Sequence, residues 1–494
     1  MTEPTPPIEL TGTAPRWTGA VAVPAGALDE LRAVTSVVDD EHGVAEASRD
    51  WWPLALHWSL AGEVPQRAAA VVRPASTDEV VAVVRVCAAH HLPLTVAGGR
   101  SGVTGASVPA FGGILLDTTA LAGIVAVDAT SGVIEVLAGT FGPDLERELQ
   151  ADHHLSVGHF PQSFDIATVG GWVACRGAGQ YSTRYGKIEE MAVGLEVVLA
   201  DGSVVRTGGA PAAAVGPDLN QLFIGSEGTF GIVTRVWLRA HAVSPTDSRL
   251  VFWFDSFAAG VEACRTILQR GATPAVLRLY DGVESARGHG GDGTRCVLLV
   301  LDEGDPLLVD ATMAVVADAC ATAGGEQGDA ALVDAWKQHR NDTSALQGLT
   351  HKGFVVDTME IAASWAALPS LFDSVRAALM AVEHALVASC HLSHSYGDGA
   401  CLYFTFAAAP PPEAVEQTFI ALWDAGQRAV LAGGGNLSHH HGVGINRARF
   451  VAEALGAGLP VLAAIKAALD PAGVLNPGKL GLPSPFGDPP WPPR

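Results

Sequence analysis

Three consecutive histidines, His439, His440 and His441, lie in the stretch SHHHGVG near the C-terminal end of the 494-residue chain. Neutral imidazoles bind divalent metals, and they also exchange protons near neutral pH because their unperturbed pKa is ~6.5. A third reading is a polar turn in which the histidines only satisfy backbone carbonyl groups. Side chains of adjacent residues on an extended backbone point to opposite faces. We therefore expect only alternate histidines of this run to converge.

Three glycine-rich stretches in the first half could hold an anionic ligand: TVAGGRSGVTGAS from Thr95, GHFPQSFDIATVGGWVACRGAG from Gly158, and GSEGTFGIVTRV from Gly225. Glycines let backbone N–H groups approach and cradle an anion such as a pyrophosphate. The first stretch follows a predicted strand, but it is neither a Walker A loop nor a strict GxGxxG turn. Taken alone, it is equally consistent with a tight surface loop.

The elements that must position these residues alternate between strands and helices. A capped helix that starts at Ser76, Thr77 and Asp78 is predicted before the first glycine-rich loop, and MAVGLEVVLADGSVV predicts a hairpin around Asp201 and Gly202. From about residue 249, strand, helix and paired-strand patterns predict a second α+β unit. We divide the chain into an N-terminal extension with helical segments (1–64), a first domain (65–244), a second domain (245–480) and a proline-rich tail (481–494), with the boundary at VSPTD, 243–247.

Composition excludes several classes of function. The chain has 52 acidic and 30 basic residues, a net charge of −22, which disfavours nucleic acid and anionic membrane surfaces as partners. Its seven cysteines are scattered without CxxC spacing, which favours a reducing cytoplasm over a disulfide framework. The acidic, proline-rich start lacks the pattern of a secretory signal, and no apolar run approaches the ~18 residues of a membrane span. We expect a soluble cytoplasmic protein without a transmembrane segment.

In this order and spacing, the three glycine-rich stretches resemble the FAD-binding domain of the vanillyl-alcohol oxidase or PCMH-type flavoprotein superfamily. That family's fold is α+β, with a two-subdomain FAD-binding domain followed by a cap domain built on an antiparallel sheet. The resemblance implies that the first loop holds the pyrophosphate of FAD through Thr95, Val96, Ala97, Gly98, Gly99, Arg100, Ser101 and Gly102. It implies that the flavin is lined by Gln162, Ser163, Phe164, Asp165, Ile166, Ala167, Thr168, Cys175, Arg176, Gly177 and Ala178. The site would be completed by Glu227, Gly228, Thr229, Phe230, Gly231, Ile232 and Val233.

The flavin is expected to be bound without a covalent bond. Members of the superfamily that attach FAD covalently use a histidine in the first loop. This chain has Gly99, Arg100, Ser101 and Gly102 there instead.

The second half resembles the C-terminal domain of FAD-linked oxidases and ends with LDPAGVLNPGKL, 469–480. The glycolate, D-lactate and 2-hydroxyglutarate dehydrogenases of this superfamily carry an HGDGNLH strand and an EHG turn that supply a divalent metal with ligands. In this chain Leu402 or Tyr403 stands in place of the strand histidine, and His440 replaces the glutamate. We therefore expect no metal.

The same substitutions match the alkyldihydroxyacetonephosphate synthase (alkylglycerone-phosphate synthase) branch, whose GACIYF-like strand, SHHHGVG turn and TVGGWV segment resemble this chain over roughly residues 60–480. This resemblance implies a redox-neutral exchange of a fatty acid for a fatty alcohol on a ketone phosphate, at the flavin N5 atom. The implied catalytic residues are Tyr403 as general base or acid, His439, His440 and His441 beside it, Arg278 and Arg340 for the anion, and His159 near the flavin. We expect an imidazolium to lower the pKa of the Tyr403 phenol.

Two alternatives remain open. One is an FAD-dependent dehydrogenase or oxidase that takes a hydride from a 2-hydroxy acid or alcohol, as in the D-lactate and glycolate enzymes. The other is a flavin-binding protein without turnover, and Tyr403 beside the histidine turn argues against it. The substrate is expected to be a small molecule that is lipid-like in the synthase reading, and a homodimer is left open.

Overall fold

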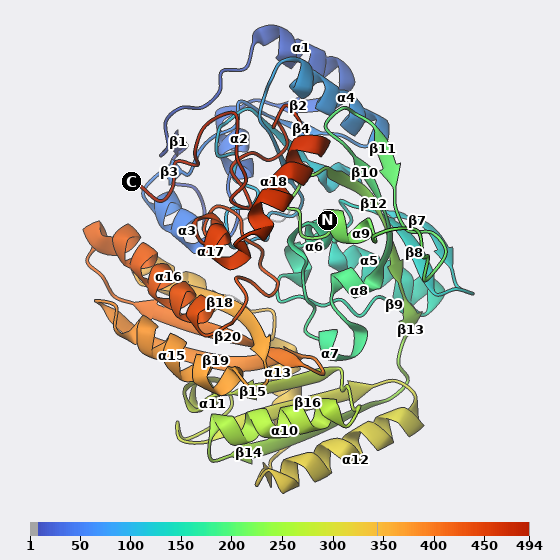
Figure 1. Cartoon of the computed structure of the whole chain (residues 1–494), viewed down its shortest axis with the longest axis vertical. Helices are drawn as coiled ribbons and strands as arrows, with labels where there is room; N and C mark the ends of the chain where they lie inside the picture. Colours follow the sequence, from blue (N-terminus) through green and yellow to red (C-terminus); the bar gives the residue numbers. More distant parts are fainter. Residues whose placement is uncertain (1–7, 343, 494) are drawn as a thin grey trace.

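The computed structural model describes residues 8–342 and 344–493, which form three main sheets (Figure 1). The first sheet has four strands in the order β2-β4-β6-β5, and the last three are parallel. These strands are β2 (Ser36–Val38), β4 (Ala70–Arg73), β6 (Ile114–Asp117) and β5 (Leu94–Ala97). Helix α4 (Thr77–Ala89), capped by the Ser76 hydroxyl as predicted, packs on this sheet together with α1 (Ala25–Val34). The first glycine-rich loop therefore follows directly from strand β5.

The second sheet has five antiparallel strands in the order β11-β10-β12-β8-β7. They are β11 (Val204–Arg206), β10 (Ala192–Val198), β12 (Ile232–Arg239), β8 (Val133–Leu137) and β7 (Ile124–Asp128). The pairing of β10 with β11 is the predicted hairpin. Helices α5 (Gly142–Glu148) and α6 (Val169–Cys175) cover the sheet through apolar residues such as Leu145, Val169 and Trp172.

The third sheet has seven antiparallel strands in the order β17-β14-β16-β15-β19-β20-β18. They are β17 (Glu326–Gln327), β14 (Asp247–Phe254), β16 (Cys296–Glu303), β15 (Val276–Tyr280), β19 (Ala385–Ser395), β20 (Gly399–Ala408) and β18 (Val355–Ser364). One face carries α10 (Phe257–Gln269), α12 (Pro306–Thr322), α15 (Leu368–Met380) and α16 (Val415–Ala432) (Figure 1). On the other face, Tyr181 of the first half packs against Val276 and Leu299. The predicted α+β class and the antiparallel sheet of the second domain are confirmed.

The C-terminal part of the chain returns from the third sheet to the first two. Helix α18 (Gly458–Leu469) packs on the core of the second sheet, and Val474 and Leu475 enter the core of the first. The proline-rich tail runs on as an extended strap, because the Trp491 ring is buried 4.9 Å from the Trp52 ring. The segment that we assigned wholly to the second domain thus contributes to both halves of the molecule.

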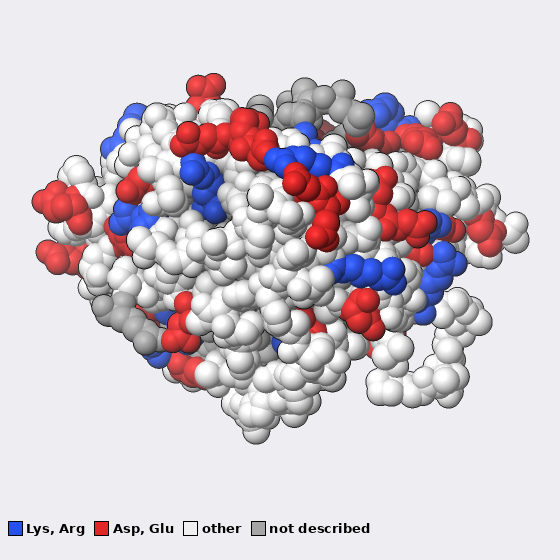
Figure 2. Space-filling view, turned by 90° about the horizontal axis from the view of Figure 1, so that it is seen from above, with Lys and Arg blue, Asp and Glu red and all other residues white. Residues whose placement is uncertain are grey.

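The remaining elements are short. Strand β1 (Ala14–Pro15) pairs with β3 (Glu63–Val64), and β9 (Leu155–Ser156) pairs with β13 (His241–Ala242). The remaining helices are α2 (Glu41–Ala47), α3 (Pro53–Leu60), α7 (Ser182–Tyr185), α8 (Ile188–Met191), α9 (Asn220–Phe223), α11 (Gly282–Gly288), α13 (Ala331–His339), α14 (Ser344–His351) and α17 (Val451–Leu455). Within the described residues no single helix is long and apolar enough to cross a membrane, and only the pair 448–455 and 458–469, bent by 118°, passes by length and composition together. Acidic and basic side chains lie interspersed on the face shown in Figure 2.

Candidate functional site

A cavity of about 810 Å³ lies between the two halves of the molecule. All three glycine-rich stretches form one side of its wall, and side chains from β15, β18, β19 and β20 form the other. Its volume is near the upper end of the ~300–1,000 Å³ that ligand sites occupy. The chain therefore brings the segments of the expected FAD site and the expected catalytic residues to one place.

Most of the residues expected from the sequence line this cavity. Those from the first half are Val96, Ala97, Gly98, Gly99, Arg100, Ser101, Gly102, His159, Gln162, Ser163, Asp165, Ile166, Ala167, Thr168, Cys175, Gly177, Ala178, Glu227, Gly228, Gly231, Ile232 and Val233. Those from the second half are Arg278, Arg340, Tyr403, His440 and His441.

Six expected residues do not lie on the cavity wall. Arg176 has a left-handed backbone and turns outward to Glu189 and Gln221. The other five are Thr95, Phe164, Thr229, Phe230 and His439. Of these, the Phe164 ring stacks on the wall residue Trp172 with 6.5 Å between the ring centres, and the His439 ring contacts the wall residue His440. The structure therefore does not place these six residues among those that line the cavity.

Glycines in the first loop let it pack closely against the second glycine-rich stretch. A Cβ added at Gly99 would lie 1.9 Å from the Ile166 carbonyl oxygen, and one at Gly98 would lie 2.3 Å from the Thr168 hydroxyl. Only glycine fits this contact between the first and second stretches. Three buried nitrogen atoms of cavity residues have no hydrogen-bond partner within residues 8–342 and 344–493. They are both ring nitrogens of His159 and Nε of Arg100. Burial lowers the pKa of His159 to about 3, so this ring is neutral.

The histidine turn is folded around one buried carboxylate. Oε1 of Glu360, on β18, accepts hydrogen bonds from the Ser438 hydroxyl (2.6 Å) and from the backbone N–H groups of His440 (3.2 Å) and His441 (2.9 Å). Both carboxylate oxygens also pair with Arg447. Burial alone would raise the pKa of Glu360, but Arg447 and His441 hold it well below its usual range. The carboxylate is therefore a permanent anion that fixes the turn.

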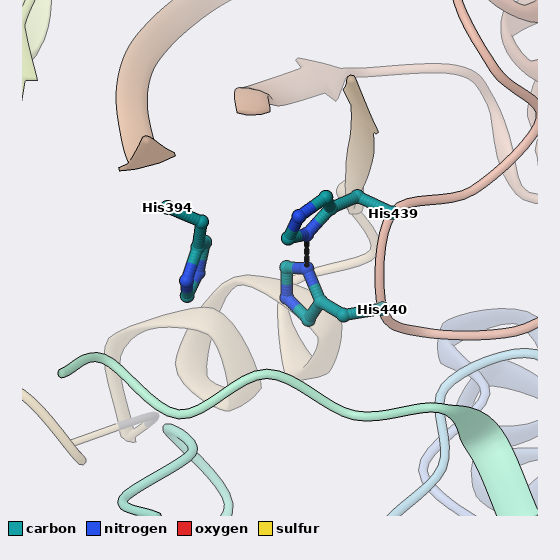
Figure 3. A group of neighbouring side chains, drawn as sticks. All are labelled: His394, His439 and His440. Atoms are coloured by element: carbon teal, nitrogen blue, oxygen red, sulfur yellow. Dashed lines mark hydrogen bonds between the residues drawn. The ribbon is translucent and has the colours of Figure 1, made fainter. Parts of the chain in front are cut away.

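Because the turn is tightly bent, adjacent histidines converge, and our expectation that only alternate ones do so is wrong. Nδ1 of His439 lies 2.8 Å from Nδ1 of His440 (Figure 3). The ring of His394, at the end of β19, stacks beside both rings, and the three residues offer nitrogens within 4.8 Å of one another. Burial holds the pKa of all three imidazoles well below its usual value. The cluster is therefore neutral.

Tyr403 lies beside this cluster but is not activated by it. Its ring stacks on His391 with 4.8 Å between centres and lies 6.0 Å from the His440 ring, while its hydroxyl donates to Thr358 Oγ1 at 3.1 Å. Burial raises the pKa of Tyr403, and no imidazolium is present in the cluster to lower it. The expected lowering of the phenol pKa is therefore corrected. Tyr403 is suited to donate a proton or a hydrogen bond.

Arg278 is held at the cavity by a chain of hydrogen bonds from β15 to β19. Its Nη2 donates to Nε2 of His391 at 2.8 Å, and Nδ1 of His391 lies 2.9 Å from Glu284 Oε2. Because a guanidinium only donates, Nε2 of His391 must be the acceptor and Nδ1 must carry the proton. Burial and the nearby Arg278 lower the pKa of His391, consistent with this neutral form. This chain of hydrogen bonds holds the positive charge of Arg278 at the cavity.

Arg340, just after α13, supplies a second positive charge. Its guanidinium carbon lies 5.3 Å, 5.2 Å and 5.7 Å from the ring centres of Phe160, Tyr181 and Trp336. Its Nη1 is buried and has no hydrogen-bond partner in the described part of the chain. The guanidinium carbon of Arg278 also lies 5.7 Å from the Trp336 ring, so the two cations share one indole. Two guanidiniums this close favour an anionic group between them.

Several wall residues were not expected from the sequence. They are Glu284, His391 and His394, the tryptophans Trp51 and Trp336, and an apolar group from α3 and α14, Leu56, Leu346 and Leu349. Only the spacing of His391 and His394 on one strand, in CHLSHS, could have drawn attention to them. The others come from separate elements whose meeting no local pattern records.

Comparisons with known proteins agree with this geometry. Residues 68–208 match the FAD binding domain family, and residues 245–480 match the C-terminal domain of the FAD linked oxidases. The FAD-linked oxidoreductase YgcU of Escherichia coli O157:H7 is 30% identical over 432 residues, which cover 83% of this chain and 88% of that protein. The alkyldihydroxyacetonephosphate synthase of Trypanosoma brucei brucei is 29% identical over 481 residues, covering 88% and 76%. A solved structure of an alkyldihydroxyacetonephosphate synthase superposes with a TM-score of 0.79 at 24% identity, covering 96% of this chain and 90% of that one.

Proposed function

We propose that this chain, which belongs to the FAD-linked oxidase family and has FAD as its cofactor, is an enzyme. Its substrate would be a small oxygenated molecule with an anionic group, as expected for a protein similar to alkyldihydroxyacetonephosphate synthase. The observation that carries this proposal is the pair Arg278 and Arg340. Both guanidiniums meet the same cavity and the same indole, and Arg340 keeps a buried N–H without a partner among the described residues. An anionic group would satisfy that donor.

The cofactor would lie against the three glycine-rich stretches. Bound FAD supplies an electrophilic ring that can accept a hydride or a carbon nucleophile. Gly98 and Gly99 let the first loop approach the second without a side chain between them. His159, neutral and unpartnered within the described chain, is available as a hydrogen-bond donor or acceptor on the first-half side of the cavity.

The protein's own proton donors and acceptors lie on the opposite wall. Tyr403 keeps its proton at neutral pH and would donate a hydrogen bond to a substrate oxygen. The neutral His440, which lines the cavity, would accept a proton from the substrate at Nε2, because its Nδ1 is engaged by His439. Arg278 and Arg340 would hold the anionic group and orient the substrate between these residues.

The lipid-like substrate remains part of the proposal. Leu56, Leu346 and Leu349 form an apolar part of the wall that could take an alkyl chain. A synthase would need such a surface beside its phosphate-binding cations. An enzyme that acts on a small hydroxy acid would not need it.

A second candidate is a dehydrogenase or oxidase of a 2-hydroxy acid or alcohol. The specific observation in its favour is that the paired arginines fit a carboxylate as well as a phosphate. The two reactions differ in their redox outcome: the oxidoreductase leaves the flavin reduced, and the synthase returns it unchanged.

Anaerobic mixing of the purified holoenzyme with candidate substrates tests both. The visible absorbance of the flavin is followed while the products are analysed. Ether formation from an acyl ketone phosphate and a fatty alcohol, without lasting loss of flavin absorbance, supports the synthase reading. Complete bleaching by a hydroxy acid supports the oxidoreductase reading. No reaction with either class would contradict the proposed function.

A further inference from the structure

A second cavity, of about 620 Å³, lies beyond the histidine cluster as seen from the FAD cavity. Its wall includes Ser182 and Tyr185 of α7 and the segment Ser395–Gly397, which joins β19 to β20. Tyr396 is half-buried, and Gly397 and Asp398 after it are exposed. This cavity therefore lies near the surface, in contact with the loop that carries Tyr396.

A continuous chain of hydrogen bonds connects the two cavities. The hydroxyl of Tyr396, on the wall of the second cavity, lies 2.7 Å from Nε2 of His439. Nδ1 of His439 lies 2.8 Å from Nδ1 of His440, which lines the FAD cavity (Figure 3). The two ring nitrogens of His439 thus contact different neighbours, as a group that passes a proton through itself requires.

We propose that Tyr396, His439 and His440 form a proton relay between the FAD cavity and the second cavity. This rests on the proposed function in one respect, namely that a proton is taken up or released in the FAD cavity. Either reaction considered above needs this, because each removes or replaces a proton on the substrate. The relay gives that proton a route that does not require the cavity to open.

The relay works with neutral rings and conserves protons. A proton leaving the substrate is taken by Nε2 of His440, and the proton on Nδ1 of His440 passes to Nδ1 of His439. The proton on Nε2 of His439 then passes to the Tyr396 oxygen, as the Tyr396 hydroxyl proton leaves to water in the second cavity. No electron moves, each ring ends with one proton, and transfer in the reverse direction restores the starting tautomers.

The surroundings of the chain favour proton transfer over metal ligation. Two imidazole nitrogens bound to one tetrahedral metal at ~2.0–2.1 Å would lie about 3.3 Å apart, whereas the two Nδ1 atoms are 2.8 Å apart. Nδ1 of His394 is engaged by the Ser182 hydroxyl at 2.7 Å. The nearest cation, Lys187, is occupied by the backbone oxygen of His439 at 2.7 Å and by Glu189. The pair is thus at hydrogen-bonding distance, and its neighbours hold it there.

Tyr396→Phe tests the relay, with Tyr185→Phe as the matched control. Both variants remove one hydroxyl from the wall of the second cavity, but the Tyr185 hydroxyl donates to Glu303 and does not contact the histidines. The holoenzyme is mixed with reduced methyl viologen, which delivers electrons without protons, and a pH indicator in weak buffer follows proton uptake alongside flavin absorbance. We expect Tyr396→Phe to slow proton uptake roughly tenfold or more, and Tyr185→Phe to leave it unchanged. Equal rates in all three proteins would overturn the relay.

A second measurement does not depend on reduction or turnover. With ¹⁵N-labelled histidine, the ring nitrogen shifts report the tautomers of His439 and His440 at neutral pH. We expect neutral rings whose tautomer populations change in Tyr396→Phe and not in Tyr185→Phe. Protonated rings, or one zinc ion per chain that shifts all three rings of the cluster, would overturn the proposal. If the relay passes both tests while no candidate substrate reacts, the proposed function fails and the relay stands.

Discussion

Glu360 and Arg447 form an ion pair in which both side chains are fully buried. The pair joins β18 of the third sheet to the segment that follows the histidine turn, and the same carboxylate holds the backbone of that turn. A buried charge that loses its partner is costly because the remaining ion is neither solvated nor paired. The position of His440 at the cavity therefore depends on Glu360.

Glu360→Gln is expected to lower the free energy of unfolding by about 3–5 kcal/mol, because Arg447 is left buried without its counter-ion. Urea denaturation at pH 7 measures this change. Glu453→Gln, whose carboxylate pairs with Arg428 at the surface, serves as the control and should change stability by less than about 1 kcal/mol. A Glu360 variant as stable as the control would show that the pair does not hold the fold.

Stability should also depend on pH through this pair. The folded pKa of Glu360 lies below the unfolded value of ~4.3. Its contribution is therefore present above about pH 4.3 and is lost as the pH falls toward the folded pKa. Urea denaturation from pH 6 down to pH 3 should show a smaller loss of stability in Glu360→Gln than in the unmodified protein. Parallel curves would contradict this.

Arg278→Ala and Arg340→Ala should each lower kcat/KM, by an amount that corresponds to a loss of about 2–5 kcal/mol of transition-state stabilisation. Each variant removes a desolvated charge that would hold the substrate anion, and the flavin content should stay intact. The measurement is steady-state kinetics together with the ratio of flavin to protein absorbance. Arg270→Ala removes an arginine that pairs with Asp318 at the surface, and should leave both quantities unchanged. Unchanged kinetics in Arg278→Ala would remove it from the site.

Tyr403→Phe should lower kcat by about 10²–10⁴-fold, because the ring fills the same space but cannot exchange a proton. Since burial raises the pKa of Tyr403, the unmodified enzyme should show no tyrosine deprotonation between pH 6 and 9 in its kcat profile. Activity near that of the unmodified enzyme in Tyr403→Phe would exclude a role for this hydroxyl in proton transfer.

Acid precipitation of the purified protein should release all of the yellow colour into the supernatant. The first loop, Gly98–Gly102, contains no histidine that could hold FAD covalently. Absorbance of the pellet and of the supernatant is measured after precipitation. Flavin retained in the washed pellet would show a covalent bond to another side chain.

Gly99→Ala should yield protein with little bound FAD, because its Cβ would lie 1.9 Å from the Ile166 carbonyl oxygen and push the first two stretches apart. The control is Gly26→Ala in α1, where an added Cβ meets no atom within 4 Å. The ratio of flavin to protein absorbance is compared after purification. Full flavin content in Gly99→Ala would mean that the loop can shift without loss of the cofactor site.

Local patterns were sufficient to predict much of the fold. The Ser76 cap, the β10–β11 hairpin and the alternation of strands and helices follow from spacing and propensity within a few residues. The α+β class and FAD as cofactor were implied by the resemblance of three glycine-rich stretches, in their order and spacing, to a flavoprotein family. Residues of the cofactor and catalytic sets could thus be named from the sequence.

Their environment could not be, because it is made by residues far apart in the chain. Tyr403, His440 and Glu360 come from β20, the histidine turn and β18, and only their packing buries the phenol and neutralises the imidazoles. The sequence by itself indicated most of the residues that line the cavity. The tertiary structure decided which nitrogens are free, which groups are charged and that Tyr396 contacts His439, because desolvation and hydrogen bonding depend on neighbours that no local pattern records.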